Sequence, residues 1–293
     1  MRITVFTPAY NRGYIIENLY RSLQRQSFLD FEWLVIDDGS SDDTQTRFDQ
    51  FLSEENLFSI RYIKTENGGK HRAINRGVQE AKGELFFIVD SDDYITDDSL
   101  EWIDKVEKSI PPEEKQFFAG VCGLKGHDSG NFIGTTFQGE YLDITTLERE
   151  NHNITGDKAE VFYTNILRKY PFPAFEGEKF ITECVVWDRI AADGYKLRFY
   201  NRLAMICNYL EDGLSAGVEK LQFSNPRGYG LFLYQRVKYK KLVGLEVWNS
   251  YFRFVEGTKD RFRFAQICKM LHMNPLVLWV RLFGMKVFYT LYD

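Results

Sequence analysis

The first hundred residues alternate short apolar runs with longer segments in which apolar side chains recur at helical spacing. The apolar runs that predict buried strands are residues 3–6, 31–36, 60–63 and 85–89. Between them, helices are predicted through 15–23 and 73–81, and the polar run 40–42 supplies candidate caps for another helix. Strands joined by helical crossovers predict an α/β fold, with a mostly parallel sheet flanked by helices on both faces. The ligands of such sheets bind at the carboxyl ends of the strands.

The rest of the chain has a looser pattern. From Phe117 the sequence is rich in glycine and β-type residues, and the glycines between Gly120 and Gly126 indicate a strand with bends. A helix is predicted around residues 183–192. Residues 221–293 contain twelve Lys or Arg against four Asp or Glu, a net +8, so the preceding residues carry −13 of the total of −5. Aromatic residues interleave these cations, which indicates amphipathic helices in the C-terminal segment.

Composition narrows the classes of protein. A chain of 293 residues with 44% hydrophobic and 27% charged residues can form a sizeable core. Its net charge of −5 provides no basic surface for nucleic-acid binding. The four cysteines form no CxxC pair, which argues against a zinc site and favours a reducing compartment. The start MRITVFTPAYN does not resemble a signal peptide, and no apolar stretch reaches the roughly 18 residues of a membrane span. We therefore expect a cytoplasmic location.

Acidic residues gather where the second and fourth predicted strands end. The run FFIVDSDD delivers Asp90, Asp92 and Asp93, and the run WLVIDD delivers Asp37 and Asp38. Clustered carboxylates repel one another, so they need a cation or must stay hydrated. Hard oxygen ligands suit Mg²⁺ or Mn²⁺, which complete their coordination shell with water and substrate phosphate. The alternative is that these aspartates only cap helices and turns, where Asp is also favoured.

Two further polar segments lie at the same predicted edge. Residues 7–11 (TPAYN) follow the first strand, and the turn 66–70 (ENGGK) supplies glycines and one cation. Glycine-rich turns with a nearby cation suit a phosphate-bearing ligand. One nucleotide could therefore span the two segments and the acidic strand ends.

Together these motifs resemble the inverting glycosyltransferases of family 2, which have the GT-A nucleotide-sugar-binding fold. The resemblance rests on TPAYNR at 7–12, QSFLDFEWLVIDDGSSDDT at 26–44, ENGGKHRAINRG at 66–77 and GELFFIVDSDDY at 83–94. It is strong over residues 1–100, looser to residue 216, and fades in the basic C-terminal segment. It implies a GT-A (Rossmann-like) domain over 1–220, with a nucleotide-binding half (1–100) and an acceptor half (101–220), and a helical C-terminal extension over 221–293.

The resemblance also implies which residues contact the donor. Tyr10 would stack on the base, Asp38 would read uracil, and the Asp90-Ser91-Asp92 triplet matches the family's DxD motif. In the family the DxD acids hold a divalent cation, here Mn²⁺ or Mg²⁺, on the diphosphate; Asp92 is the first candidate ligand, with Asp90, and Asp93 is a further one. The predicted nucleotide-sugar-binding residues are Pro8, Ala9, Tyr10, Arg12, Asp38, Asn67, Gly69, Lys70, Asn75, Asp90, Ser91 and Asp92.

Inversion requires a base that removes the proton from the acceptor hydroxyl. In the family this base belongs to an ED-type pair that opens a helix downstream of the DxD motif. The matching segment here is FEGEKFITECVVWDRIA, residues 175–191. Glu183 matches the family's Glu, although Cys184 replaces the Asp that usually follows. Glu178 and Glu176 are the alternative bases.

The sequence thus predicts a metal-dependent inverting glycosyltransferase of the hexosyltransferase type. It would move a sugar from a nucleotide-sugar, in particular a UDP-sugar, to a saccharide or lipid-linked acceptor in cell-surface polysaccharide synthesis. Trp187 and Glu178 are the predicted acceptor contacts, although a Trp at helical spacing is more often core. A nucleotidyltransferase on a sugar phosphate is the second interpretation, and it would release pyrophosphate rather than UDP. A non-catalytic carbohydrate-binding or assembly module is the third, which Cys184 keeps open and the intact DxD motif argues against.

The basic, aromatic C-terminal segment has two interpretations. It packs on the acidic domain as a helical cover, or it holds the protein peripherally at the inner face of the plasma membrane, where a lipid-linked acceptor resides. Each Lys or Arg near an anionic surface contributes roughly 1 kcal/mol of binding, so roughly four or five of them facing lipid would suffice for attachment.

Overall fold

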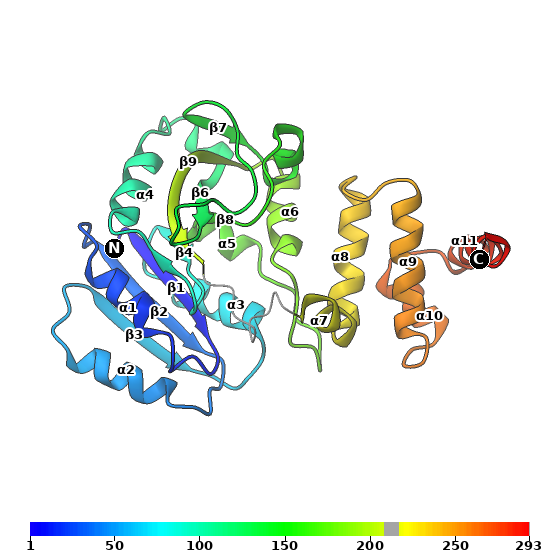
Figure 1. Ribbon diagram of the computed structural model, residues 1–293, viewed down its shortest axis with the longest axis horizontal. Helices are drawn as coiled ribbons and strands as arrows, with labels where there is room; N and C mark the ends of the chain where they lie inside the picture. Colours follow the sequence, from blue (N-terminus) through cyan, green and yellow to red (C-terminus); the bar gives the residue numbers. More distant parts are fainter. Residues whose placement is uncertain (208–216, 293) are drawn as a thin grey trace.

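The protein, described here by a computed structural model over residues 1–207 and 217–292, is built around one mixed β-sheet with helices on both faces (Figure 1). The strands are β1 (Ile3–Ala9), β2 (Phe31–Asp37), β3 (Ser59–Lys64), β4 (Leu85–Ile88), β5 (Tyr94–Ile95), β6 (Phe118–Gly126), β7 (Tyr141–Ile144), β8 (Lys158–Tyr163) and β9 (Lys196–Ile206). Within the described ranges their order is β3-β2-β1-β4-β8-β6-β9-β5, and β7 pairs with β9.

The helices fall into two groups. Those of the α/β part are α1 (Glu17–Gln24), α2 (Thr44–Ser53), α3 (Lys70–Glu80), α4 (Ser99–Lys108), α5 (Thr164–Lys169) and α6 (Cys184–Ala192), with the 3₁₀ turns η1 (Lys115–Phe117) and η2 (Thr146–His152). Those of the C-terminal segment are α7 (Val218–Ser224), α8 (Pro226–Lys238), α9 (Leu245–Thr258), α10 (Phe264–Met270) and α11 (Pro275–Tyr292).

Strands β1 to β4 form a parallel half of the sheet, as the sequence predicts. Ala9 pairs with Asp37, and Phe6 pairs with Ile88, so β1, β2 and β4 end close together. Every residue of β1 and β2 is buried, because both faces of these central strands are covered, and this is why they read as nearly continuous apolar runs. The loops after β1, β2 and β4 therefore meet at one edge of the sheet.

The second half of the sheet is mixed. β8 lies antiparallel between β4 and β6, whereas β6 and β9 are parallel. β5 and β7 are both antiparallel to β9. The continuous run of parallel strands is thus β1–β4, and β6 and β9 form one further parallel pair. The glycine-rich strand predicted after Phe117 is β6, whose pairing with β9 has several register shifts.

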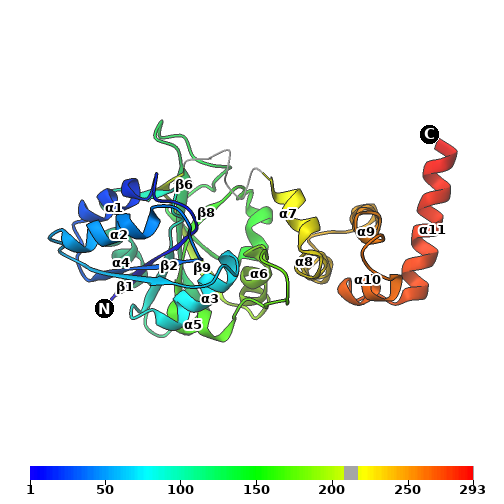
Figure 2. The ribbon, with the colours of Figure 1, turned by 90° about the horizontal axis from the view of Figure 1, so that it is seen from below.

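Two apolar cores lie on opposite faces of the sheet. On one face, α1, α2 and α4 pack through side chains such as Leu19, Phe48 and Ile103. On the other face, α3, α5 and α6 pack through side chains such as Ile74 and Val186. Figure 2 shows these two helical layers on either side of the strands. The arrangement confirms the predicted α/β fold with helices on both faces.

The C-terminal helices form a small core of their own beside α6, which includes Leu233, Tyr251, Phe254 and Leu278. Figure 2 shows α7 and α8 nearest the α/β part and α11 farthest from it. The domain boundary predicted at residue 220 falls inside α7 and stays a prediction. Within residues 1–207 and 217–292, we find no helix with both the length and the apolar character needed to cross a membrane.

Candidate active site

The loops after β1 and β2 are tied together by polar contacts. The Asn11 N–H donates to Ser40 Oγ (2.8 Å), and the Ser41 N–H donates to Asn11 Oδ1 (2.8 Å). Asn11 has a φ of 52°, in the left-handed region that Asn tolerates better than most residues. Ser40 and Ser41, which the sequence offers as helix caps, thus fix the loop that follows β1 instead, and the N-cap residue of α2 is Asp43.

The predicted base-contacting residues follow from this loop. Pro8 and Ala9 are the last residues of β1, and Tyr10 beyond them is 48% exposed, so its ring is accessible for stacking. The Arg12 N–H donates to Thr44 Oγ1 (2.9 Å). Against the effect of burial, the positive charge of Arg12 adds to that of Lys70 and Lys125 in lowering the pKa of Asp90, the first carboxylate after β4. The loop after β1 is therefore part of the same site.

Asp38 shapes the glycine turn that precedes α3. Its Oδ1 accepts from the Gly68 N–H and its Oδ2 from the Gly69 N–H, both at 2.7 Å, while Asn67 Nδ2 donates to the Asp38 carbonyl (2.8 Å). Burial raises the pKa of Asp38. Both oxygens of this buried carboxylate are engaged by the turn that delivers Lys70, so these contacts fix the turn and give no support to the predicted reading of uracil.

Gly69 occupies a position that only glycine fits. Its φ is 95°, and a Cβ there would lie 1.8 Å from the carbonyl oxygen of Lys179. The predicted residue Asn67 is contacted from the same segment, because Lys179 Nζ donates to Asn67 Oδ1 (2.6 Å). The turn before α3 is therefore packed directly against the chain that leads into α6.

Lys70 joins the two carboxylates predicted for metal binding and for catalysis. Its Nζ lies 2.7 Å from Asp90 Oδ1 and 2.8 Å from Asp90 Oδ2, and it lies 2.8 Å from Glu183 Oε1. Burial opposes the charge on Lys70, but the attraction of Asp90 and Glu183 outweighs it and raises the pKa of Lys70 above its usual value. In return, and against the effect of burial, Lys70 lowers the pKa of Asp90. Lys70 and Asp90 are therefore both charged at neutral pH.

The other two acids after β4 lie in a more negative environment. Burial and the neighbouring charge of Asp90 raise the pKa of Asp92. Asp93 is 6% exposed, and Cys207 Sγ donates to its Oδ2 (3.2 Å) while Lys125 Nζ lies 3.7 Å away. Burial, opposed in part by Lys125, raises the pKa of Asp93 to about 6. Ser91, between Asp90 and Asp92 in the sequence, is buried.

The donor set at this edge determines what it can bind. Among the residues described, no three His, Cys, Asp or Glu side chains are grouped so that they could hold a metal by themselves. Two aspartates that follow one strand are nevertheless the usual protein contribution to a Mg²⁺ or Mn²⁺ site, which takes its other oxygens from phosphate and water. Burial, and after it the charge of Asp90, raise the pKa of Asp92, and a bound cation would offset both effects.

Glu178, predicted as an acceptor contact and alternative base, is placed elsewhere. Its Oε1 accepts from the Arg227 N–H (2.8 Å) and its Oε2 from the Gly228 N–H (2.9 Å), so it caps the N-terminus of α8. The residue is 6% exposed. Both carboxylate oxygens of Glu178 are thus engaged by backbone N–H groups, and these contacts give no support to its predicted roles as an acceptor contact and alternative base. The other alternative, Glu176, is exposed.

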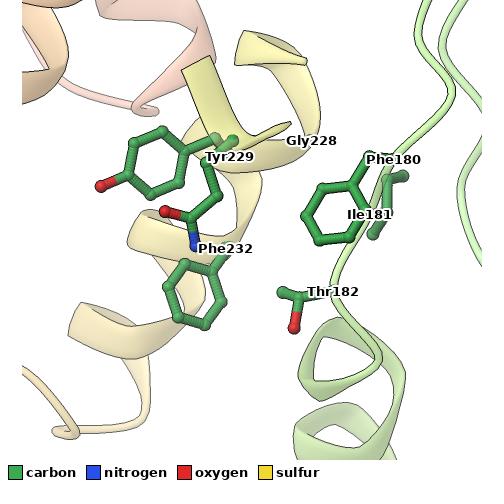
Figure 3. Close-up of a pocket in the computed structure, with 7 residues that line it drawn as sticks. Phe180, Ile181, Thr182, Gly228, Tyr229 and Phe232 are labelled. Atoms are coloured by element: carbon green, nitrogen blue, oxygen red, sulfur yellow. The ribbon is translucent and has the colours of Figure 1, made fainter. Parts of the chain in front are cut away.

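The chain between Glu178 and Glu183 is fixed by the C-terminal helices. Asn225 Oδ1 accepts from the Lys179 N–H (2.7 Å) and the Phe180 N–H (3.1 Å). Figure 3 shows the adjoining hollow, in which Phe180 and Ile181 face the aromatic side chains of α8. Helices α7 and α8 therefore position the segment that leads directly to Glu183.

Two predicted residues are turned away from the Lys70 contacts. The Trp187 ring stacks on Phe162, with ring centroids 4.3 Å apart, which is the core packing that the sequence left open. Asn75 Nδ2 donates to the Phe172 carbonyl (2.9 Å), and Asn75 Oδ1 accepts from the Phe172 N–H (2.8 Å). Both ends of the Asn75 amide are thus engaged by backbone on the far side of α3, and these contacts give no support to a nucleotide contact.

Sequence reasoning also missed residues that surround the acids. Lys125 lies near the end of β6, beside Asp93. The feature that could have indicated it in the sequence is a single charge near the end of an otherwise apolar and glycine-rich run. Cys207 follows β9 and carries no comparable signal. Its contact with Asp93 depends on β9 and β5 pairing, which brings distant parts of the chain together.

Comparison with known proteins agrees with this geometry. Residues 4–115 match the family described as Glycosyl transferase family 2. The chain is 32% identical over 188 residues to a GalNAc(5)-diNAcBac-PP-undecaprenol beta-1,3-glucosyltransferase of Campylobacter jejuni, which covers 64% of this chain and 58% of the relative. It is 35% identical over 102 residues to the poly(ribitol-phosphate) beta-N-acetylglucosaminyltransferase TarS of Staphylococcus aureus, which covers 34% of this chain and 18% of TarS. The chain thus spans 18% to 58% of the length of these relatives.

Solved structures share the fold at lower identity. TarS residues 1–349 of S. aureus in complex with UDP-GlcNAc has a TM-score of 0.61 at 18% identity, covering 88% of this chain and 81% of that chain. The mannosyltransferase PcManGT of Pyrobaculum calidifontis, in complex with GDP-Man and Mn²⁺, has a TM-score of 0.56 at 15% identity, covering 96% and 83%. The fold is therefore the GT-A glycosyltransferase fold predicted from the sequence.

Proposed function

We propose that this protein is an inverting glycosyltransferase that moves a sugar from a UDP-sugar to a saccharide or lipid-linked acceptor. The observation that carries the proposal is the Lys70 bridge, which brings Asp90 of the DSD triplet and Glu183 at the start of α6 into one site. The family match over residues 4–115 and the relatives, which are named as glycosyltransferases, support this class of reaction.

Glu183 is the proposed general base. It takes the proton of the acceptor hydroxyl while that oxygen bonds to the anomeric carbon, and the bond from this carbon to the diphosphate oxygen breaks. UDP leaves with the electron pair, and a single displacement inverts the anomeric centre. The Glu183 carboxylate is 38% exposed, so a substrate can reach it. Lys70 is a positioning residue, because it holds Glu183 in a fixed place relative to Asp90.

The donor side is assigned to the residues at the edge of β1, β2 and β4. Tyr10 offers an exposed ring for the base, and Asp38 fixes the turn from which Lys70 extends. Asp92, with Asp90, is the proposed metal contact, because the two carboxylates follow β4 at the sheet edge where the donor is proposed to bind. A bound Mn²⁺ or Mg²⁺ would neutralise the charge that develops on the leaving diphosphate. The structure of PcManGT with GDP-Man and Mn²⁺ supports a divalent cation in proteins of this fold.

The acceptor class and location rest on the relatives and on the C-terminal helices. One relative is named for an undecaprenol-linked acceptor and another for a poly(ribitol-phosphate) acceptor, which supports a role in cell-surface polysaccharide synthesis. Helix α11 exposes Leu276, Trp279 and Phe283, and Arg281 lies on the same helix. Apolar and basic side chains on one helix favour peripheral attachment to an anionic membrane, at its cytoplasmic face.

The proposal is tested by incubating the purified protein with a panel of UDP-sugars and measuring UDP release with Mn²⁺, with Mg²⁺ and with excess chelator. We expect slow metal-dependent UDP release from one donor, and its acceleration by a lipid-linked saccharide acceptor. NMR of the product should show the anomeric configuration opposite to that of the donor. Pyrophosphate release from a nucleoside triphosphate and a sugar phosphate would instead identify a nucleotidyltransferase. UDP binding without turnover on any donor would identify a non-catalytic module.

A further inference from the structure

A pocket of about 320 Å³ lies between η2, α6 and α8, beside the proposed base. Figure 1 shows α6 and α8 side by side, and the two helices are in contact. The first two turns of α6 line the pocket through Cys184, Trp187 and Asp188, and Glu183 directly precedes Cys184. The volume lies at the lower end of the range for small-ligand sites, which is about 300–1,000 Å³. The pocket therefore shares a helix with Glu183 and has room for a small ligand.

Asp188 is a buried carboxylate that faces this pocket without a close partner. The residue is 6% exposed, and no residue in the described ranges hydrogen-bonds to its carboxylate. The nearest cation, Arg236 Nη1, lies 4.0 Å from Asp188 Oδ2, beyond hydrogen-bond distance. Burial, which the charge of Arg236 opposes only in part, raises the pKa of Asp188. Because Asp188 lines the pocket and its ion pair with Arg236 is a long one, its carboxylate oxygens can accept hydrogen bonds from a ligand that enters there.

The two arginines of the pocket are held at similar distances from its other acids, whereas Lys241 Nζ lies closer, 3.1 Å from Glu150 Oε2. Arg236 Nη2 lies 3.6 Å from Glu150 Oε1, and Arg149 Nη1 lies 3.8 Å from Glu160 Oε1. A hydroxyl group both donates and accepts, so one sugar hydroxyl between Asp188 and Arg236 can satisfy both at once. Spacings of 3.6 to 4.0 Å leave donors and acceptors available to such a ligand.

From this geometry we propose that the pocket binds a neutral sugar unit of the acceptor saccharide, with Asp188 and Arg236 as its polar contacts. The inference rests on the proposed function, and it deepens that function by naming the acceptor subsite. Three basic and four acidic side chains line the pocket, a balance that does not favour a phosphate or another anion. Trp187 also lines the pocket, where it adds apolar surface, although one face of its ring is already stacked on Phe162.

The position of Arg236 also assigns a role to the C-terminal helices. Arg236 belongs to the last turn of α8, and Lys241, which follows α8, contacts Glu150 of η2 at 3.1 Å. The proposed donor side of the site is built by residues 4–115, which match the family. Arg236 and Lys241, which line the pocket, lie outside that match. Acceptor selection is therefore built in part by a segment that the family match does not include.

Cys184 provides a direct probe of pocket occupancy. It is the exposed member of the four cysteines, since Cys122, Cys207 and Cys268 are buried. Burial and the nearby charge of Asp188 raise the pKa of Cys184 to about 11, so only a small fraction of the thiol is ionised near neutral pH. The full-length protein is therefore treated with a large excess of N-ethylmaleimide, and the slow formation of adducts is followed by intact mass. The Cys184→Ser variant identifies the labelled site. The probes are the methyl β-glycosides of glucose, galactose, N-acetylglucosamine and N-acetylgalactosamine, with inorganic phosphate tested alongside them.

We expect at least one methyl glycoside to slow the labelling of Cys184, and phosphate to have no effect. Loss of the Asp188 contact in Asp188→Asn should weaken this protection about tenfold, as should Arg236→Gln, because each removes a charge-assisted hydrogen bond. Asp193→Asn is the matched control, because this aspartate follows the same helix, is exposed and bonds to the Tyr170 hydroxyl. The control should protect like the unchanged protein.

Three results would overturn the inference. In the first, no glycoside slows the labelling of Cys184; in the second, phosphate slows it and the glycosides do not. In the third, glycosides protect Cys184 equally in Asp188→Asn and in the unchanged protein, with both proteins folded by circular dichroism. UDP binding is measured on the same samples by thermal shift. If UDP binds and no glycoside protects, the acceptor subsite is wrong while the proposed function stands. If UDP fails to bind, the proposed function itself fails.

Discussion

Lys70→Met removes the cation that joins Asp90 to Glu183 and leaves an apolar chain of similar length. Hydrogen bonds from a cation to an ionised, largely buried carboxylate contribute about 1.5–3 kcal/mol, and this applies to the Asp90 contact. The Glu183 carboxylate is 38% exposed, so solvent screening reduces its share to about 0.5 kcal/mol. We therefore expect the free energy of unfolding at neutral pH to decrease by about 2–3 kcal/mol.

The pH dependence of this loss follows from the direction of two pKa shifts. The pKa of Asp90 is lowered in the folded protein, so its contribution is present above its ordinary value of about 3.9 and is lost as pH falls through the folded value. The pKa of Lys70 is raised, so its contribution is present below about 10.4 and is lost only as pH rises through the higher folded value. The difference between the unchanged protein and Lys70→Met should thus be full near neutral pH and shrink below about pH 4.

Urea denaturation followed by circular dichroism measures this difference at several pH values. Lys82→Met is the matched control, because this lysine is exposed on the connection between α3 and β4 and should change stability by less than about 0.5 kcal/mol. A Lys70→Met loss no larger than that of the control would refute the reasoning. So would a loss that stays constant or grows as the carboxylates are protonated.

Four further outcomes are expected. Glu183→Gln should lower kcat by about 10² to 10⁴ with UDP affinity unchanged, and a larger kcat loss in Glu178→Gln than in Glu183→Gln would move the base to Glu178. Glu178→Ala should lower the free energy of unfolding by about 1–2 kcal/mol, because α8 loses its cap. Asp92→Asn should abolish metal-dependent transfer while retaining the fold, and full transfer by this variant or in excess chelator would disprove the metal role. Replacing Trp279 and Phe283 by Ser should abolish co-sedimentation with anionic vesicles at low salt. Added salt should weaken attachment of the unchanged protein, because the Debye length falls from about 8 Å at physiological ionic strength to about 3 Å at 1 M. If the unchanged protein does not bind vesicles at low salt, the C-terminal helices are a structural cover alone.

The sequence by itself determined the elements that local pattern encodes. β1 and β2 lie at the centre of the sheet with both faces covered, so their side chains had to be apolar along the strand, and the runs were visible. Helical spacing located α3 and α6. The aspartates after β2 and β4 were readable as a site because the carboxyl ends of parallel strands meet at one edge.

Only the tertiary structure decided how these parts meet. Lys70 contacts Glu183 across more than a hundred residues, Glu178 caps α8 rather than facing a substrate, and Asp188 shares a pocket with Arg236. Such contacts depend on the antiparallel insertion of β8 and on the packing of α8 against α6, both of which join distant segments. Local periodicity records whether a residue is buried, but it does not record the neighbour against which it is buried. The charge of a carboxylate is visible in the sequence, whereas its partner, and therefore its role, is set by the fold.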